Sequence, residues 1–408
     1  MVIEMNTAKT ILLAVLLVFF GRYLRKKIPF LVRWSLPEAV VGGTLFAILT
    51  LILYQLNLVK FKFDTSLQSF FMQLFFTASG FEASGELIKK SSGKLVIFII
   101  LAAVLAVLQN AIAVGMSPIV GLDPKLGLMC GSIPLTGGHG NAAAYAPLAE
   151  DAGVTGAVSV AVAAATYGLA AGSIIGGPVA TRLIKKYNLA TPVNQEKAEA
   201  SREAFLENQA DDQVVLDKKR VALASAMIFI GLGVGAYLAD LFKILFPSLT
   251  LPVHVMGMIG GAIVRNVYDA IKGTSKATPA KEIDIFGSVC LSIFVSMAVM
   301  SMALWDLIAL AIPLILILAA ETVATIIFTY FVTFKAMGSD YDAAVMAGGH
   351  IGFGMGAVPA SMANMTAVCS VYGFSKLAFI IVPVVGGMFS NFTNAANITF
   401  FMNLVGIQ

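Results

Sequence analysis

Apolar stretches long enough to cross a membrane recur along the whole chain. A helix needs about 20 apolar residues to span the hydrocarbon core of a bilayer. Polar or basic residues separate these stretches, so each one predicts a separate helix. The predicted spans are residues 8–21, 36–57, 66–88, 95–116, 154–184, 221–245, 252–270, 284–304, 308–334 and 374–403. This pattern predicts an all-α polytopic membrane protein with about ten transmembrane helices.

Two further segments, residues 123–150 and 340–368, are apolar but rich in glycine, proline and polar side chains. Neither has the pattern of one continuous helix. Irregular backbone inside a bilayer is stable only where protein or a water-filled cavity satisfies its polar groups. Each segment is therefore predicted to form a re-entrant hairpin, which enters the membrane and returns to the side from which it came.

One segment departs from the apolar composition. Residues 186–220 contain seven acidic side chains and end in three basic residues. This segment is predicted to be a soluble linker. It divides the chain into an N-terminal half, residues 1–185, and a C-terminal half, residues 221–408. Each half has five predicted spans and one predicted hairpin.

The amount of charge supports a membrane location. Only 12% of the 408 residues are charged, whereas soluble domains carry about a quarter. The lipid bilayer is therefore the expected surrounding. The net charge of +4 is small, and no nucleic-acid partner is expected. The sequence has no phosphate-binding Walker motif and no recognisable nucleophile and base, so we expect neither ATP-driven transport nor an enzyme, and no resident cofactor.

Basic residues are concentrated in alternate loops. The clusters lie in residues 22–33, 89–94, 182–186, 218–220 and 272–281. Positive charge stays on the cytoplasmic side when membrane proteins insert. Both termini are therefore predicted to lie outside, with the linker in the cytoplasm. Because five spans is an odd number, the second half is predicted to be inverted relative to the first.

Sequence landmarks recur in the same order in the two halves. Leu36–Gly42 aligns with Leu251–Gly257, and Asp64–Leu87 aligns with Asp284–Leu307. A Gly-Gly-His sequence also occurs in each of the two breaks. Inverted repeats with paired, interrupted apolar segments are a design of secondary transporters. A chance similarity between apolar sequences is the alternative.

The breaks contain groups suited to small ions. The first, residues 131–141, contains a proline and several glycines, which remove helix hydrogen bonds and free the backbone. Its exposed carbonyls and the hydroxyls of Ser132 and Thr136 suit a hard cation such as sodium, and helix N-termini at the break suit an anion. Residues 348–359 form the second copy. For the individual glycines, close helix packing is the alternative.

His139 and His350 each follow a glycine pair. Either side chain is open to a hydrogen bond across the break, to proton transfer or to contact with a substrate. A neutral structural histidine is the alternative for each. The two histidines do not provide the spacing of a zinc site.

Acids inside predicted spans are functional candidates because a charge in the bilayer is costly. Glu82 and Glu321 are such acids. Each is open as a ligand of a coupling cation, as a proton carrier or as a buried partner of Arg265. Arg265 itself is expected to extend toward the cytoplasmic end of its span.

The last predicted span carries amides at Asn391, Asn394 and Asn397. Their spacing of three residues predicts a polar stripe that faces a cavity or another helix. Thr166, on the fifth span, offers a further oxygen ligand.

Several motifs are distributed through both halves. They are Pro37-Glu38 with Gly42-Gly43, Gln109-Asn110-Ala111-Ile112, Gly121-Leu122-Asp123-Pro124, Gly137-Gly138-His139-Gly140, Tyr341-Asp342-Ala343-Ala344-Val345 and Gly348 to Gly356. This set resembles the bacterial sodium/glutamate symporter family over nearly the whole chain. The resemblance implies two inverted five-span domains, each with a re-entrant hairpin. It also implies sodium-coupled uptake of glutamate by alternating access, a homodimer and a location in the bacterial inner membrane.

Three features depart from the family pattern. Glu82 and Glu321 stand where uncharged amides are expected, and Asn141–Tyr145 replaces a small-residue run that ends in tryptophan. An extra buried acid would allow proton coupling or a different substrate. The alternatives are therefore a proton- or sodium-coupled carrier of another small carboxylate or amino acid, and a channel.

The candidate substrate- and sodium-binding residues come from the two breaks and from polar positions in the neighbouring spans. Sodium is expected as the coupling ion, held by backbone carbonyls and hydroxyls of the two hairpins. The candidates are Ser132, Thr136, Gly137, Gly138, His139, Gly140, Asn141, Gly348, Gly349, His350, Gly352, Gly354, Gly356, Ser361, Asn364, Glu82, Gln109, Asn110, Glu321, Thr322 and Thr166.

Overall fold

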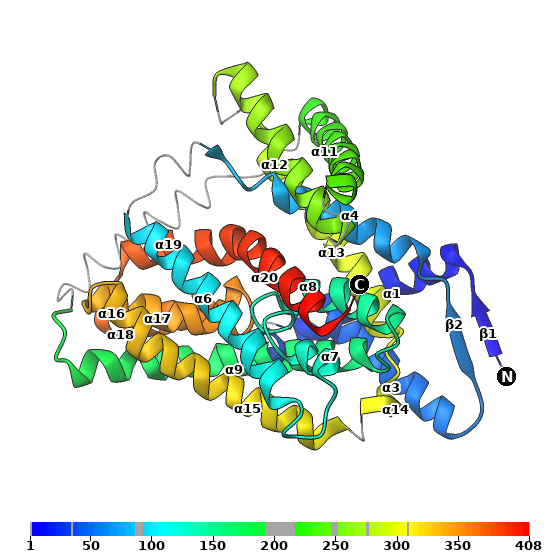
Figure 1. Ribbon diagram of the computed structural model, residues 1–408, viewed down its shortest axis with the longest axis horizontal. Helices are drawn as coiled ribbons and strands as arrows, with labels where there is room; N and C mark the ends of the chain where they lie inside the picture. The colour runs from blue at the N-terminus through cyan, green and yellow to red at the C-terminus, as the bar shows by residue number, and fades with distance from the viewer. Residues whose placement is uncertain are drawn as a thin grey trace.

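Helices form nearly all of the protein, and eight of those in the described residues are long and apolar enough to cross a membrane (Figure 1). The computed structural model describes residues 2–33, 36–85, 93–191, 217–245, 252–274, 277–307 and 310–407. The eight are α1 (Thr7–Lys27), α3 (Glu38–Gln55), α6 (Gly93–Met116), α9 (Ala157–Lys186), α11 (Lys218–Leu245), α13 (Ala280–Met300), the continuous run α15–η3–α16 (Ala311–Ala336) and the run α19–η4–α20 (Lys376–Val405). The predicted class of polytopic helical membrane protein is confirmed.

Two of the ten predicted spans form helices that are not among these eight. The segment 66–88 forms α4 (Ser66–Gly80), which has 15 residues and ends in a turn, and residues 86–88 lie outside the described part of the chain. The segment 252–270 forms α12 (Val253–Lys272), which has 20 residues. α3 and α12 both begin directly after a proline with extended backbone, Pro37 and Pro252.

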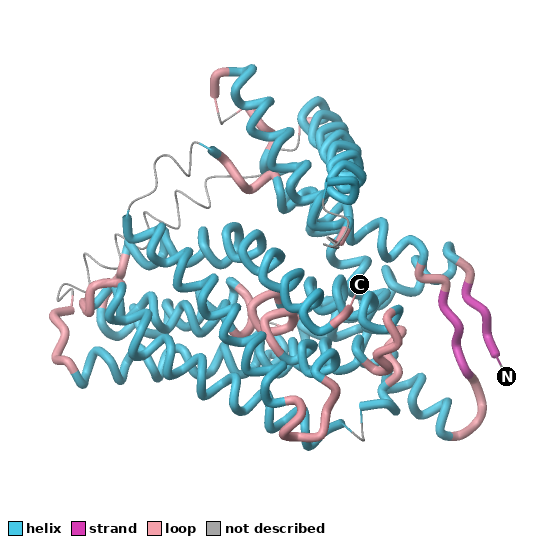
Figure 2. The backbone as a smooth tube through the Cα atoms, viewed as in Figure 1, coloured by secondary structure: helices cyan, strands magenta, loops and turns pink. Residues whose placement is uncertain are grey.

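Both predicted hairpins consist of two helical arms joined by non-helical residues (Figure 2). In the first, α7 (Pro124–Gly127) and the 3-10 turn η1 (Leu128–Cys130) lead through turns to α8 (Gly138–Asp151). In the second, residues 355–357 separate α17 (Tyr341–Gly354) from α18 (Val358–Tyr372).

The second Gly-Gly-His sequence does not form a break, and that prediction is wrong. Gly348, Gly349 and His350 lie inside α17, whereas Gly138 begins α8. The helix continues because the glycines permit close packing: a Cβ on Gly349 would lie 2.9 Å from Val382 Cγ1. The irregular backbone of the second hairpin starts at Met355, after the motif.

A seam of glycines brings α9 against α17. A Cβ on Gly168 would lie 2.2 Å from the carbonyl oxygen of Met355, and one on Gly176 would lie 2.4 Å from that of Gly348. Gly172, between them, faces Gly352 in the same way. Only residues without a side chain allow two backbones to approach this closely. The seam fixes the second hairpin on a helix of the first half.

The two halves of the sequence are packed into each other. α4 of the first half packs on α12 and α13, and α3 also packs on α13. α9 packs on both arms of the second hairpin, and α20 packs on α6. Figure 1 shows α11, α12 and α4 together at the top, with α17 and α18 on the left beside α9. Most of the predicted linker, residues 192–216, lies outside the described part of the chain.

A short sheet departs from the predicted all-α class. β1 (Val2–Met5) pairs in parallel with β2 (Lys60–Phe63), shown in magenta in Figure 2. Asp64, at the end of β2, accepts hydrogen bonds from the hydroxyls of Thr7 and Ser66. This carboxylate therefore joins the N-terminal segment to the start of α4.

Candidate functional site

The breaks of the two hairpins meet at a glutamine of α6. Gln109 Nε2 donates to the carbonyl oxygen of Gly354 over 2.6 Å. The Thr136 hydroxyl donates to Gln109 Oε1 over 2.7 Å and also lies 3.2 Å from that Gly354 oxygen. Three candidates predicted from separate parts of the sequence therefore form one contact, which joins both hairpins.

Backbone groups of the two hairpins also face each other here. Gly138 has a φ of +62°, which favours glycine. A Cβ at this residue would lie 3.1 Å from the carbonyl oxygen of Gly356. The neighbouring oxygens belong to a hydroxyl, an amide and backbone carbonyls, which are the neutral ligands that suit sodium. In the described residues, no three His, Cys, Asp or Glu side chains gather as for a metal ion.

Three amides surround the start of the first break. Ser132 N–H donates to Asn110 Oδ1 over 2.8 Å. Asn394 Nδ2 donates to the Ser132 carbonyl over 3.0 Å, and Asn397 Nδ2 donates to the Ser132 hydroxyl over 3.1 Å. The predicted amide stripe of the last span thus faces another element at two positions, whereas Asn391 bonds to Gly387 of its own helix.

The two candidate histidines lie in different surroundings. His139 Nε2 lies 3.0 Å from the Thr166 hydroxyl. That hydroxyl donates to Val162 O, so its oxygen is free to accept from the His139 ring. His350 Nδ1 lies 3.0 Å from the Thr333 hydroxyl. His139 therefore ties α8 to α9, while His350 lies inside the packing of α17.

Aromatic rings enclose His350 on two sides. The centroids of the Phe98 and Phe353 rings each lie 5.0 Å from its own. This side chain is fully buried, and its Nε2 has no hydrogen-bond partner in the described segments. Its partner Thr333, in the π-helical segment η3 (Phe328–Thr333), was not among the residues predicted from the sequence.

Ser361 and Asn364 hold the second hairpin together. Ser361 Oγ donates to Gly349 O over 2.7 Å, and Asn364 Nδ2 donates to Gly172 O on α9 over the same distance. A Cβ on Gly352 would lie 2.4 Å from the Ser361 backbone. These groups bind to protein atoms of the hairpin and of the helix that supports it.

Three candidates of the first hairpin are packing residues. Asn141 is buried against Gly137, where a Cβ would lie 2.1 Å from Asn141 Nδ2. Gly140 faces Leu291 of α13 and Phe75 of α4. The hairpin thus lies against helices of both halves.

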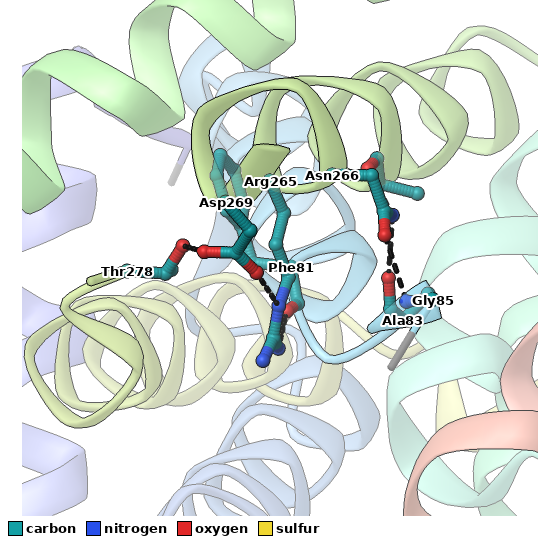
Figure 3. A network of polar contacts seen from close by, with 8 residues as sticks. Phe81, Ala83, Gly85, Arg265, Asn266, Asp269 and Thr278 are labelled. Atoms are coloured by element: carbon teal, nitrogen blue, oxygen red, sulfur yellow. Dashed lines mark hydrogen bonds and ion pairs between the residues drawn. The ribbon is translucent and has the colours of Figure 1, made fainter. Parts of the chain in front are cut away.

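Glu82 does not join the hairpins. It lines a cavity of about 70 Å³ between α4, α12 and α13, together with Arg265 and Asp284. Figure 3 shows Arg265 bonded to the carbonyl of Phe81 and paired with Asp269. Arg265 is buried rather than extended toward the cytoplasm as predicted, because these oxygens satisfy its guanidinium within the helix bundle.

Glu321 and Thr322 lie beside each other on α15 but face different helices. The Thr322 hydroxyl lies 2.9 Å from the hydroxyl of Tyr167 on α9. Glu321 is 0% exposed, and neither of its carboxylate oxygens has a hydrogen bond to another residue that the structure describes. The backbone amide of Ala113 on α6 faces this carboxylate without reaching hydrogen-bond geometry.

Comparison with known proteins gives matches along nearly the full chain. A profile of the sodium/glutamate symporter family matches residues 3–374. A Haemophilus influenzae protein named sodium/glutamate symporter is 40% identical over 392 residues, 96% of each chain. Proteins of the same name from Escherichia coli and Shigella flexneri are 37% identical over 404 residues, 98% of each chain. The similarity includes both hairpins and the helices that hold them.

Proposed function

Since the chain belongs to the sodium/glutamate symporter family, we propose that it carries glutamate into the cell together with sodium by alternating access. The relatives named sodium/glutamate symporter match 96% to 98% of the chain and the same shares of their own length, so the proposal draws on nearly all of each relative. The helices that can cross a membrane and the two hairpins are the parts such a carrier needs. We further propose a homodimer in the bacterial inner membrane.

The contact among Thr136, Gln109 and Gly354 is the observation that carries the proposal. It brings the first break and the last residue of α17 to one place, where neutral oxygens can replace the water of a sodium ion. Two helices also begin here, α8 at Gly138 and α18 at Val358. Their N-termini favour a carboxylate. Sodium and an anionic amino acid therefore find complementary groups between the hairpins.

Contacts between helix ends support the inverted arrangement of halves 1–185 and 221–408. Lys94, at the start of α6, pairs with Asp340, which caps the second hairpin, over 3.3 Å. The first hairpin instead starts near the end of the chain, where a Cβ on Gly406 would lie 3.9 Å from Lys125. The proposed hairpins enter from opposite sides, with basic ends such as Lys94 in the cytoplasm.

A transport assay with a single substitution tests the proposal. Purified protein in proteoliposomes is expected to accumulate labelled glutamate when a sodium gradient is imposed. Thr136→Val removes the hydroxyl that joins the hairpins, and we expect the apparent sodium affinity to fall about tenfold, equivalent to ~1.4 kcal/mol.

Ser225→Ala serves as the matched control. It removes a hydroxyl that donates only to Val221 within α11, and we expect unchanged uptake. Failure of the unmodified protein to accumulate glutamate with sodium would contradict the proposed function. Accumulation driven by a pH gradient without sodium would favour a proton-coupled carrier, a possibility motivated by the buried Glu321. Ion current without accumulation would indicate a channel.

A further inference from the structure

Glu321 is a buried acid without a visible partner in a helix that can cross a membrane. Its side chain is 0% exposed, and neither oxygen forms a hydrogen bond or an ion pair within the described part of the chain. A bare carboxylate removed from water costs several kcal/mol. An acid in this position therefore requires a bound cation or proton.

The groups beside Glu321 come from three elements. Ala113 of α6 and Cys130 of η1 both lie near the Glu321 carboxylate. Asn110 lies one turn before Ala113 on the same face of α6. Thr325 lies one turn after Glu321 on α15. The described neighbours supply no basic side chain to this carboxylate.

Several of these groups lack partners as well. Among the residues that the structure describes, the Thr325 hydroxyl and Asn110 Nδ2 are buried and have no hydrogen-bond partner, like both Glu321 oxygens. The Asn110 amide cannot simply be reversed, because its Oδ1 accepts from Ser132 N–H. The Glu321 carboxylate and the Thr325 hydroxyl, one helical turn apart, are therefore two unpartnered oxygens on the same helix that can serve one bound ion.

We propose that the Glu321 carboxylate and the Thr325 hydroxyl bind one sodium ion at a site separate from the contact between the hairpins. Both groups are hard oxygen ligands, which sodium prefers, and the ion neutralises the buried charge. Asn110 links the site to the first break, since it lies one turn before Ala113 on α6 and accepts a hydrogen bond from Ser132 N–H. An ion at Glu321 therefore stabilises the arrangement of the first hairpin.

The inference rests on the proposed sodium-coupled transport, and it predicts one more sodium ion per cycle than the hairpin contact alone. Glu321→Gln keeps the shape of the side chain and removes its charge. In proteoliposomes held at zero membrane potential, each coupled sodium ion multiplies the limiting glutamate accumulation by the sodium gradient. With a tenfold gradient, we expect this variant to accumulate about tenfold less glutamate at steady state. An unchanged accumulation ratio would overturn the proposal.

A binding measurement covers the case in which Glu321→Gln does not transport. The full chain, purified in detergent, is titrated with sodium chloride against choline chloride while its thermal unfolding is followed. We expect the sodium concentration for half-maximal stabilisation to rise at least tenfold in Glu321→Gln and several-fold in Thr325→Val. Asp240→Asn, an exposed acid on α11, is the matched control and is expected to leave this concentration unchanged.

The outcomes separate the site from the proposed function. Sodium stabilisation that depends on Glu321, in a protein that does not accumulate glutamate, would retain the site and remove the proposed function. Sodium-driven uptake with no effect of Glu321→Gln on accumulation or stabilisation would retain the proposed function and overturn the site. Stabilisation by acid without sodium that is lost in Glu321→Gln, together with no Glu321-dependent effect of sodium, would replace the sodium ion with a proton and overturn the assignment.

Discussion

At the residue scale, Tyr145 and His254 show that polar atoms can be buried without hydrogen-bond partners among the described residues. Their ring centroids lie 4.6 Å apart where α8 meets α12, and His254 also packs on Phe76. Within the described part of the chain, neither the Tyr145 hydroxyl nor His254 Nε2 has a hydrogen bond. An unsatisfied buried polar atom costs about 1–3 kcal/mol. The contact between the first hairpin and α12 is therefore polar in composition but is held by packing.

We expect Tyr145→Phe to stabilise the protein by about 1 kcal/mol, because it removes an unsatisfied hydroxyl and keeps the ring. Thermal unfolding of the purified protein in detergent measures the change. Tyr341→Phe is the matched control: the Tyr341 hydroxyl donates to Gly373 O, so its loss is expected to lower the unfolding temperature. A lower unfolding temperature for Tyr145→Phe would show that its hydroxyl has a partner in solution.

Individual candidates differed in how far the sequence could predict them. The amide spacing of the last span predicted a shared face, and Asn394 and Asn397 do meet Ser132 on one face. The isolation of Glu321 was not predictable, since it depends on what α6 and η1 place beside it. The two glycine pairs looked equivalent, yet only the first adjoins a break. The sequence does not distinguish a glycine that permits irregular backbone from a glycine that permits close packing of another helix.

At the scale of elements, the lengths of the apolar stretches in the sequence predicted the helices well. Predicted spans 95–116 and 221–245 became α6 (Gly93–Met116) and α11 (Lys218–Leu245). The β1–β2 pair was missed, although Lys60–Phe63 alternates basic and aromatic residues as strands do. Its partner strand is far away in sequence, so the pairing itself is a tertiary property. The π-helical segments are likewise set by packing.

The pairing of β1 with β2 is expected to weaken in acid. Hydrogen bonds from the hydroxyls of Ser66 and Thr7 lower the pKa of Asp64 to about 2. Because an unfolded aspartate titrates near 3.9, this stabilisation is present above about pH 4 and is lost as the pH falls toward 2. Hydrogen exchange of residues 2–5 as a function of pH measures the loss.

Asp64→Asn serves as the comparison for that experiment. The amide cannot ionise, so exchange in residues 2–5 is expected to be faster than in the unmodified protein at neutral pH, with no added transition between pH 4 and 2. The same acid transition in both proteins would assign it to another group.

At the scale of the whole molecule, the two halves of the sequence form one packed body. α4 needs α12 and α13 to cover it, and α9 needs both arms of the second hairpin. Buried hydrogen bonds cross the halves as well, including Gln109 to Gly354 and Asn364 to Gly172. Neither half can satisfy these groups alone, so folding of the halves is mutually dependent.

We therefore expect two chains, residues 1–200 and 201–408, to assemble when they are produced together. Co-purification and gel filtration in detergent should give a complex of the size of the uncut protein. Residues 1–200 produced alone should aggregate, because the faces of α4 and α9 remain uncovered. A soluble, monodisperse first half would contradict this dependence.

The glycine seam of α9 has a consequence for biosynthesis. Its partner arm α17 and the Asn364 amide on α18 emerge from the ribosome up to roughly 180 residues after α9 ends, a delay of about 10–40 s at typical synthesis rates. During that interval, the exposed glycine face is open to other membrane helices and to proteases. A bulkier residue at Gly172 or Gly176 would prolong this exposure. Its first effect would appear as fewer carriers per cell rather than as a slower carrier.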